Sequence, residues 1–324
     1  MVLILTHEQD VSTRGVIRWL DYLGKEVIVF HKERDWINIK DIDYNKGEVL
    51  FESKNYGVFA LSNIEAVFCR GGIIRIKDYV KHPGQYENFK TSLQYFLSAH
   101  SISHLEAITH FLFEKNTIGQ NGVGRYNKML ALNLAKKVGL DIPHTIFTDS
   151  KEKALSFCNE HDEIITKSLD LNFMYQDTRN AKRFFEYTAI ITKADIEGLP
   201  TKFGLTIFQE KINKQYEIRV FYLKEKLYCF AIFSQKNKKT QVDYRCYDRE
   251  RMNRMIPFQL PLDVGKKVSA FMKKAKLDTG SIDLIYGLDK KFHFLEVNPI
   301  GQFGYLSNIN NYKIEKQIAL ALIN

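Results

Sequence analysis

The sequence predicts an α/β protein of two or three lobes, and three observations carry this prediction. The chain opens with a strand, a helix and a second strand, residues 121–124 interrupt the regular pattern with two glycines, and the part beyond residue 204 is rich in strands. Its 324 residues exceed a single domain of roughly 150 residues. We expect an N-terminal domain at 1–118 and two further subdomains at 119–204 and 205–324.

The opening of the chain follows the pattern of a parallel sheet. Residues 2–6 are apolar, residues 12–23 form an amphipathic helix that Gly24 ends, and residues 26–30 are again mostly apolar. A strand, a helix and a second strand in this order favour parallel pairing of the two strands. Residues 64–69 add a further strand to this sheet.

The remaining elements are helices and strands that end in a strand-rich segment. Apolar residues at three- and four-residue spacing predict a helix over 83–114, which closes the first lobe. The second lobe is expected to hold helices at 126–138 and 151–160 and strands at 143–147 and 163–167. Five strands are expected after it, at 205–211, 216–223, 226–234, 281–287 and 291–297.

Composition and charge narrow the class of protein. With 45% hydrophobic and 26% charged residues the chain is expected to fold, and no apolar run reaches the ~20 residues that span a bilayer. The N-terminus lacks the pattern of a signal peptide, so we expect a cytoplasmic protein. The four cysteines and nine histidines show no metal-ligand spacing and no disulfide framework. A net charge of +9 favours an anionic partner, which is nucleic acid, nucleotide phosphate or an acidic peptide.

Three residues with side-chain oxygens near the C-terminus form a candidate metal site. Glu296 and Asn298 lie two apart in an expected strand, so both side chains point to the same face. Asp283 lies in the strand before it, and hairpin pairing would turn its carboxylate to the same point. Carboxylate and amide oxygens are ligands that Mg²⁺ prefers. The alternative is a solvated sheet face, but the apolar neighbours of Glu296 and Asn298 favour the metal site.

A charged strand face lies upstream of these residues. Glu217 and Arg219 share one face of an expected strand, and the apolar residues beside them share the other. The guanidinium of Arg219 can hold a phosphate through two hydrogen bonds, and Lys167, at the end of an apolar strand, suits a phosphate contact. An ordinary cross-strand ion pair explains Glu217 and Arg219 equally well, and a snorkelling side chain explains Lys167. The spacing leaves both interpretations open.

In chain order, these residues resemble the signature of the ATP-grasp superfamily. The resemblance spans 126–298 and rests on Lys128, Lys167, Gln209-Glu210-Lys211, Glu217, Arg219, Asp283, Glu296 and Asn298. It implies an ATP-grasp fold with an N-terminal Rossmann-like pre-ATP-grasp domain. It further implies ATP and Mg²⁺ as cofactors.

The same resemblance implies a role for each residue of the signature. Lys128 and Lys167 would contact ATP phosphates, and the segment Gln209, Glu210, Lys211 and Ile212 would hold adenine. Glu217 would lie near the ribose and Arg219 at the transferred phosphate. The Mg²⁺ ligands would be Asp283, Glu296 and Asn298.

A narrower resemblance is to the graspetide maturases, the microviridin-type ligases, and in particular to their grasp-with-spasm branch. It rests on residues 3–13, 68–70 and 242–245 and covers nearly the full chain. It implies that Arg245 is a second basic contact in the reaction site with Asp243 beside it, although a local ion pair is the alternative. It also implies a homodimer.

The resulting expectation is a ligase that activates a carboxylate as an acyl phosphate. The substrate would be an acidic precursor peptide, with a leader and a core rich in Thr/Ser and Asp/Glu, in which side-chain ester or amide cross-links form. An ATP-grasp ligase that joins an amino acid or small amine to a carboxylate would use identical site chemistry. A basic nucleic-acid-binding module without catalysis is a rival of another class, but the sequence holds no motif of that kind.

Overall fold

The computed structural model describes residues 1–77, 90–169, 174–177, 182–185, 187–237, 239–244, 246, 250 and 252–324. The chain divides into two compact units. The first comprises Met1–Gly124 together with Gln302–Asn308 and Lys313–Asn324, and the second comprises Arg125–Gly301 together with Ile309–Tyr312. The C-terminal end of the chain therefore returns to the N-terminal unit. The boundaries expected at 118/119 and 204/205 stay a prediction.

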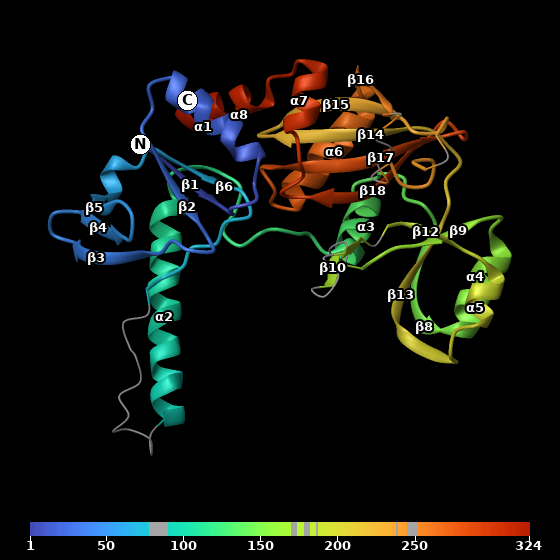
Figure 1. Cartoon of the computed structure of the whole chain (residues 1–324), viewed down its shortest axis with the longest axis horizontal. Helices are drawn as coiled ribbons and strands as arrows, with labels where there is room; N and C mark the ends of the chain where they lie inside the picture. Colours follow the sequence, from blue (N-terminus) through green and yellow to red (C-terminus); the bar gives the residue numbers. More distant parts are fainter. Residues whose placement is uncertain are drawn as a thin grey trace. The chain divides into compact units, whose positions relative to one another are not determined.

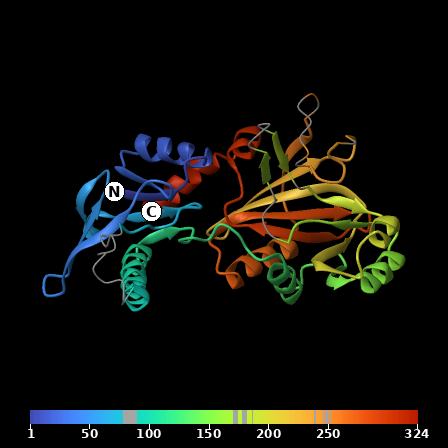
Figure 2. The same ribbon diagram turned by 60° about the horizontal axis from the view of Figure 1, so that its bottom comes forward.

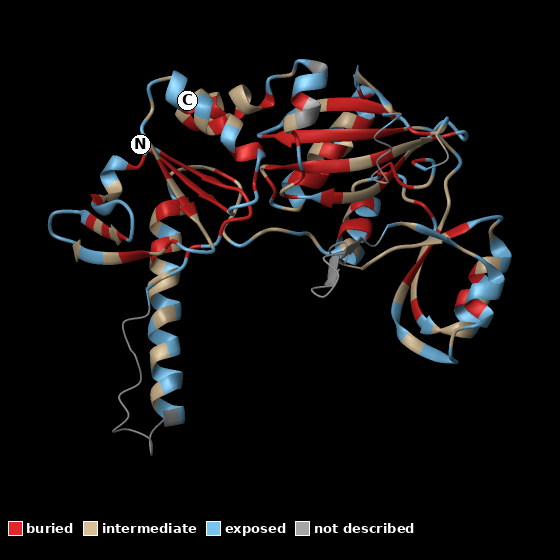
Figure 3. Ribbon diagram, viewed as in Figure 1, coloured by how far each residue is buried: buried red, intermediate tan, exposed pale blue. Residues whose placement is uncertain are grey.

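The first unit is built on a four-stranded parallel sheet in the order β2-β1-β6-β7 (Figure 1). Its strands are β1 (Val2–Thr6), β2 (Val27–His31), β6 (Ala66–Cys69) and β7 (Asn116–Ile118). Every residue of β1 and β6 is buried, which explains their uninterrupted apolar sequence (Figure 3). The helices α1 (Ser12–Tyr22) and α8 (Ile314–Ile323) pack against each other. The parallel pairing that the opening residues predict is confirmed.

A second, antiparallel sheet of the first unit has the order β3-β4-β5. It comprises β3 (Ile37–Asp43), β4 (Glu48–Ser53) and β5 (Gly57–Ala60), and the short helix η1 (Leu61–Asn63) follows it. Phe51 and Phe59 join the core that β1 and β2 supply through Leu3, Leu5 and Phe30. The sequence interpretation did not include this sheet. The expected helix over 83–114 is present as α2 (Lys90–Phe113), and 78–89 lie outside the described residues.

A buried ion pair ties the ends of two parallel strands to the C-terminal segment of the first unit. Arg70 Nε lies 3.1 Å from Asp10 Oδ2, and the two side chains are 5% and 0% exposed. Asp10 also accepts hydrogen bonds from Thr6 and Thr13. The Arg70 guanidinium carbon lies 4.8 Å from the ring centre of Phe303. Since a buried charge without a partner is costly, these contacts hold the loops after β1 and β6 in place.

The second unit begins with a four-stranded sheet in the order β12-β9-β13-β8. Its strands are β8 (Thr145–Ser150), β9 (Ile164–Thr166), β12 (Ala189–Ile191) and β13 (Lys202–Glu210). Helices α4 (Lys151–Glu160) and α5 (Lys193–Glu197) cover one small core around Phe157 and Phe208. The strands β10 (Met174–Asp177) and β11 (Lys182–Phe185) form a separate hairpin. Helix α3 (Lys128–Lys137) precedes this sheet, with the Asn127 side chain as its N-cap.

A five-stranded antiparallel sheet completes the second unit, in the order β16-β15-β14-β17-β18. The strands are β14 (Lys214–Leu223), β15 (Lys226–Phe233), β16 (Arg254–Phe258), β17 (Thr279–Gly287) and β18 (Phe292–Asn298). Helix α6 (Leu262–Lys274) packs on one face through Phe271, whose ring centre lies 4.8 Å from that of Phe294. In Figure 2, α3 and α6 lie on the same side of this sheet. Helix α7 (Gly304–Asn310) follows β18 in the chain.

Each of the five strands expected after residue 204 is present, with bounds shifted by up to three residues. The pairing of β17 with β18 is antiparallel, as the hairpin interpretation required. Among the described residues, no helix combines the length and hydrophobicity needed to cross a bilayer.

Candidate functional site

A row of charged residues crosses the five-stranded sheet from strand to strand. In the ladder, Arg219 on β14 lies opposite Asp283 on β17, and Asp283 lies opposite Glu296 on β18. Directly opposed residues point to the same face of a sheet. The structure thus brings together three of the residues that the sequence singles out.

Asn298 extends this row toward the end of β18. It lies opposite Ser281, and Ser281 and Asp283 share a face because they are two apart on β17. A β-bulge between Asp283 and Leu284 places Leu295 as an extra residue on β18. The oxygens of Asp283, Glu296 and Asn298 consequently lie on one face. Asn298 Oδ1 accepts a hydrogen bond from the amide of Ile300 at 3.1 Å, which leaves it a second lone pair.

Basic side chains contact both carboxylates of the row. Arg219 Nη1 lies 3.2 and 3.3 Å from the two carboxylate oxygens of Asp283 and donates to Tyr244 Oη at 2.6 Å. Lys128, at the start of α3, lies 3.5 Å from Glu296 Oε2 and donates to the carbonyl of Ser168 at 2.7 Å. Arg219 is 8% exposed, so its charge is little screened by solvent. The row is therefore a partly buried site of mixed charge.

A pocket opens beside this row within the second unit. Ile285, which shares the face of Asp283 on β17, lines it, as does the bulge residue Leu295. The other lining residues are Pro143, Ile165, Lys167, Thr188, Gln209, Glu210, Lys211, Ile212, Asn213, Lys214, Gln235, Gln241, Val242 and Leu288. Seven of these sixteen residues are apolar and nine are polar or charged, so the pocket offers both surface for an apolar ring and partners for polar groups of a small molecule.

Two of the expected nucleotide-binding residues contact each other in the wall of this pocket. Lys167 Nζ donates to Gln209 Oε1 at 3.1 Å, and Gln209 Nε2 donates to Thr145 Oγ1 at 2.7 Å. Gln209 is fully buried. The chain after it runs along the pocket as Glu210, Lys211 and Ile212, the segment expected to hold adenine.

The side chains of Glu210 and Lys211 make contacts outside this pocket wall. Glu210 Oε2 accepts the amide hydrogen of His144 at 3.0 Å, and Lys211 Nζ lies 2.5 Å from Glu163 Oε2. These two contacts hold the segment from Gln209 to Ile212 in position, with its backbone beside the pocket.

Glu217 is buried beside Lys214. Lys214 Nζ lies 2.5 Å from Glu217 Oε1, and Ser234 Oγ donates to the same oxygen at 2.8 Å. Burial raises the pKa of Glu217 above its ordinary value, an effect that Lys214 and the hydrogen bonds partly offset. Since Lys214 lines the pocket, this pair brings a charge to the pocket wall.

Asp243, expected beside the reaction site, is buried, and its carboxylate accepts the amide hydrogen of Thr188 at 3.3 Å. Arg245, the second expected basic contact, lies outside the described residues. Tyr244, between them in the sequence, is the residue that contacts Arg219.

Sequence reasoning missed Lys214, Tyr244 and Ser281. Lys214 lies three residues before Glu217 in a strand, and this spacing carries no same-face signal because alternate residues face alike. The pairing of β14 with β17 is irregular between Lys214 and Tyr216, and this irregularity lets the Lys214 side chain reach Glu217. Ser281 lies two residues before Asp283 on the same strand, a signal that alternation could have supplied.

Similar solved structures are known for this chain over its full length. A RiPP-associated ATP-grasp ligase of Chryseobacterium gregarium, solved with ADP and a leader and core peptide, matches with a TM-score of 0.77 at 25% identity, covering 99% of this chain and 96% of that one. The macrocyclase MdnC of Microcystis aeruginosa MRC, bound to the precursor peptide MdnA, matches with a TM-score of 0.73 at 26% identity, covering 100% and 99%.

The chain has the ATP-grasp fold. Its structural neighbours are RiPP ATP-grasp ligases, so the resemblance to this group is confirmed. The ATP-grasp ligase PsnB, complexed with a minimal precursor, Mg and ADP, has the same fold at 16% identity, with a TM-score of 0.65 and coverage of 99% of this chain and 96% of that one. No protein-family model matches the sequence, and no curated protein does.

Proposed function

We propose that this protein is an ATP-dependent carboxylate ligase that forms side-chain ester or amide cross-links in a leader-guided ribosomal precursor peptide. The observation that carries the proposal is the full-length structural match to two ligases that were solved with bound peptides. The charged row beside the pocket supplies residues of the types that such chemistry needs.

The pocket fits the nucleotide of this reaction. Ile165, Ile212 and Leu295 offer apolar surface to a base, and the chain from Gln209 to Ile212 runs along the same wall. Lys167 lies at this wall and Lys128 beside Glu296, where both would contact phosphate oxygens. Glu217, held by Lys214, would lie near the ribose.

The oxygen donors of β17 and β18 fit Mg²⁺. Asp283, Glu296 and Asn298 offer two carboxylates and an amide oxygen on one sheet face, and hard oxygen donors suit this ion. When bound, Mg²⁺ would neutralise charge on the phosphates of ATP and help to orient them. Arg219 contacts the carboxylate of Asp283, and Lys128 contacts that of Glu296. Both cations therefore lie where they would also contact the phosphate oxygens of ATP.

The chain's own residues would hold the two substrates for transfer of the γ-phosphoryl group. A carboxylate is a poor electrophile because its leaving group would be oxide. One carboxylate oxygen of the peptide attacks the γ-phosphorus, ADP leaves, and an acyl phosphate forms. A Ser/Thr hydroxyl or Lys amine then attacks the acyl carbon, phosphate leaves, and the attacking group loses its proton. Arg219 and Arg245 would stabilise the charge on the transferred group, with Asp243 beside Arg245.

The partner would be an acidic precursor peptide. A net charge of +9 attracts an acidic core by long-range electrostatics. We further propose a homodimer in the cytoplasm, on the resemblance to the graspetide maturases.

The proposal is tested by mass spectrometry of an acidic peptide, rich in Thr/Ser and Asp/Glu and encoded beside this gene, after incubation with the protein and Mg-ATP. The expected result is the loss of one water per cross-link, dependent on ATP. An unchanged peptide together with ATP consumption that requires added amino acids or small amines would instead favour the small-molecule ligase.

A further inference from the structure

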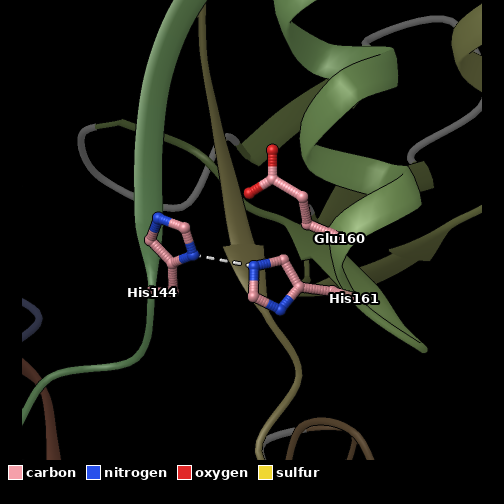
Figure 4. A group of neighbouring side chains, drawn as sticks. All are labelled: His144, Glu160 and His161. Atoms are coloured by element: carbon pink, nitrogen blue, oxygen red, sulfur yellow. Dashed lines mark hydrogen bonds between the residues drawn. The ribbon is translucent and has the colours of Figure 1, made fainter.

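Two histidines and a glutamate come together at the edge of the four-stranded sheet of the second unit (Figure 4). They are His144, just before β8, and Glu160 and His161, at the end of α4. His144 Nδ1 lies 2.8 Å from His161 Nε2, and one oxygen of Glu160 lies within 4.8 Å of a ring nitrogen of each histidine. In Figure 4, the two imidazoles point toward each other and the Glu160 carboxylate lies above the His161 ring.

The surrounding structure holds both rings in this arrangement. Phe157, a buried residue of α4, packs against both rings, with its ring centre 4.9 Å from that of His144 and 4.6 Å from that of His161. The amide of His144 donates to Glu210 Oε2, which fixes the backbone of the first ligand. The Glu160 carboxylate accepts a hydrogen bond from Ser156 one turn earlier on α4. The three groups thus need little reorganisation to bind one ion.

We propose that His144, His161 and Glu160 bind one divalent transition-metal ion of the Zn²⁺ type. Two imidazole nitrogens that share a tetrahedral Zn²⁺ lie about 3.3 Å apart, so a small rotation of the rings makes room for the ion. Two nitrogens and one oxygen suit Zn²⁺, Co²⁺ or Ni²⁺ rather than Mg²⁺, which prefers oxygen ligands. A fourth position is open to water.

The charge around the three ligands favours a cation. Asp162 and Glu163 follow His161 directly, and Glu210 lies against His144. Lys211, a nearby basic residue, is paired with Glu163, with Nζ 2.5 Å from Oε2. Without a metal, one ring donates its N–H to the other ring. Metal binding replaces this hydrogen bond, because both nitrogens then direct lone pairs to the ion.

Metal binding at this position would brace the strand that leads into the nucleotide pocket. His144 precedes Thr145, to which Gln209 donates, and His161 leads into β9. Strands β8 and β9 flank β13, whose last residues are Gln209 and Glu210. One ion would therefore join both neighbours of β13 at its pocket end. Its function would be structural and separate from the Mg²⁺ proposed at Asp283.

The test is calorimetric titration of the full-length, tag-free protein with Zn²⁺ after dialysis against a chelator, with Co²⁺ as a spectroscopic substitute. We expect one ion per chain, visible Co²⁺ absorption of a tetrahedral site, and a higher melting temperature with Zn²⁺. His144→Gln and His161→Gln should each weaken binding at least as much as the ~10–100-fold loss that removal of an outer-shell partner causes. Glu160→Gln should weaken it less, because two nitrogen ligands remain.

His110→Gln is the matched control. His110 is an exposed histidine whose Nε2 lies 3.1 Å from Glu114, so it pairs with a carboxylate but has no second histidine beside it. Its loss should leave Zn²⁺ affinity unchanged. The urea midpoint of each variant without metal shows whether it is folded.

Two results would overturn the proposal. One is the absence of stoichiometric Zn²⁺ binding to the folded wild-type protein, which would leave the pair as a hydrogen bond between imidazoles. The other is binding of equal affinity in folded His144→Gln and His161→Gln variants, which would place the ion elsewhere.

Discussion

Arg219 and Asp283 lie directly opposite each other on β14 and β17, with Arg219 Nη1 3.2 Å from Asp283 Oδ1. Their contact is one part of a row that continues to Glu296, which Lys128 approaches from α3. Cations and carboxylates therefore alternate at the point where the proposed function requires phosphate and Mg²⁺ to meet.

Removal of a carboxylate charge from the row should abolish turnover without unfolding the protein. Asp283→Asn and Glu296→Gln keep the size of each side chain but weaken the binding of a divalent cation. We expect the rate of ATP-dependent peptide modification to fall at least about a hundredfold, which corresponds to roughly 3 kcal/mol in the barrier. Glu225→Gln is the control, because Glu225 forms an exposed ion pair with Lys273. A variant of the row with wild-type activity would refute the Mg²⁺ assignment.

Gly301→Ala should displace Arg219. A Cβ at this position would overlap Ser281 Oγ and lie 3.0 Å from Arg219 Nη2. Since a shift of about 1 Å at a reacting group costs on the order of a hundredfold in rate, we expect kcat to fall by about 10–100-fold. Gly204→Ala, whose Cβ would meet no atom within 4 Å, should leave kcat unchanged. Equal kinetics for the two variants would show that the position of Arg219 does not limit the reaction.

Lys167→Met should weaken ATP binding. The ammonium group lies in the wall of the pocket beside Gln209, and its loss removes one charge-assisted contact worth roughly 1.5–3 kcal/mol. We expect KM for ATP to rise by about tenfold or more in steady-state kinetics, with a smaller change in KM for the peptide. Lys202→Met, at an exposed position of β13, is the control. A rise confined to KM for the peptide would assign Lys167 to the peptide site.

Glu217 should make the stability of the protein depend on pH. Burial raises the pKa of Glu217 from its ordinary value of 4.5, so the folded protein binds this proton more tightly than the unfolded chain does. The free energy of unfolding should therefore fall as the pH rises from 4.5 through the pKa of the folded state. Urea midpoints of the wild type and Glu217→Gln, measured over this range, should show a decline in the wild type that the variant lacks. Parallel dependence of the urea midpoint on pH in the two proteins would contradict this prediction.

The sequence predicts the site's strands well because their side chains alternate. Glu296 and Asn298 share a face, and Asp283 lies on the partner strand of a hairpin, as expected. Alternation alone does not reveal the bulge at Leu295, because a bulge depends on the pairing register. Contacts such as Arg219 with Tyr244 join segments 25 residues apart, and no local pattern predicts them.

The elements that sequence reasoning missed are those whose pattern was short or whose partner was distant. Strand β3 alternates Ile37 and Ile39 with polar residues, but it gains stability from packing on the core of the first unit. In the sequence, helix α8 is visible only as a short apolar run. Its packing partner α1 is about 300 residues earlier in the chain, so the sequence pattern does not reveal this contact. His144 and His161 are 17 residues apart, a spacing without meaning until α4 brings them together.

Activation of a peptide carboxylate is the central claim, and isotope transfer tests it most directly. The precursor peptide is prepared with heavy oxygen in its Asp and Glu carboxylates and incubated with the protein and Mg-ATP. If an acyl phosphate forms, the released inorganic phosphate carries one labelled oxygen for each cross-link, because the carboxylate oxygen bridges to phosphorus before the acyl carbon is attacked. Unlabelled phosphate released together with a cross-linked peptide would contradict the account.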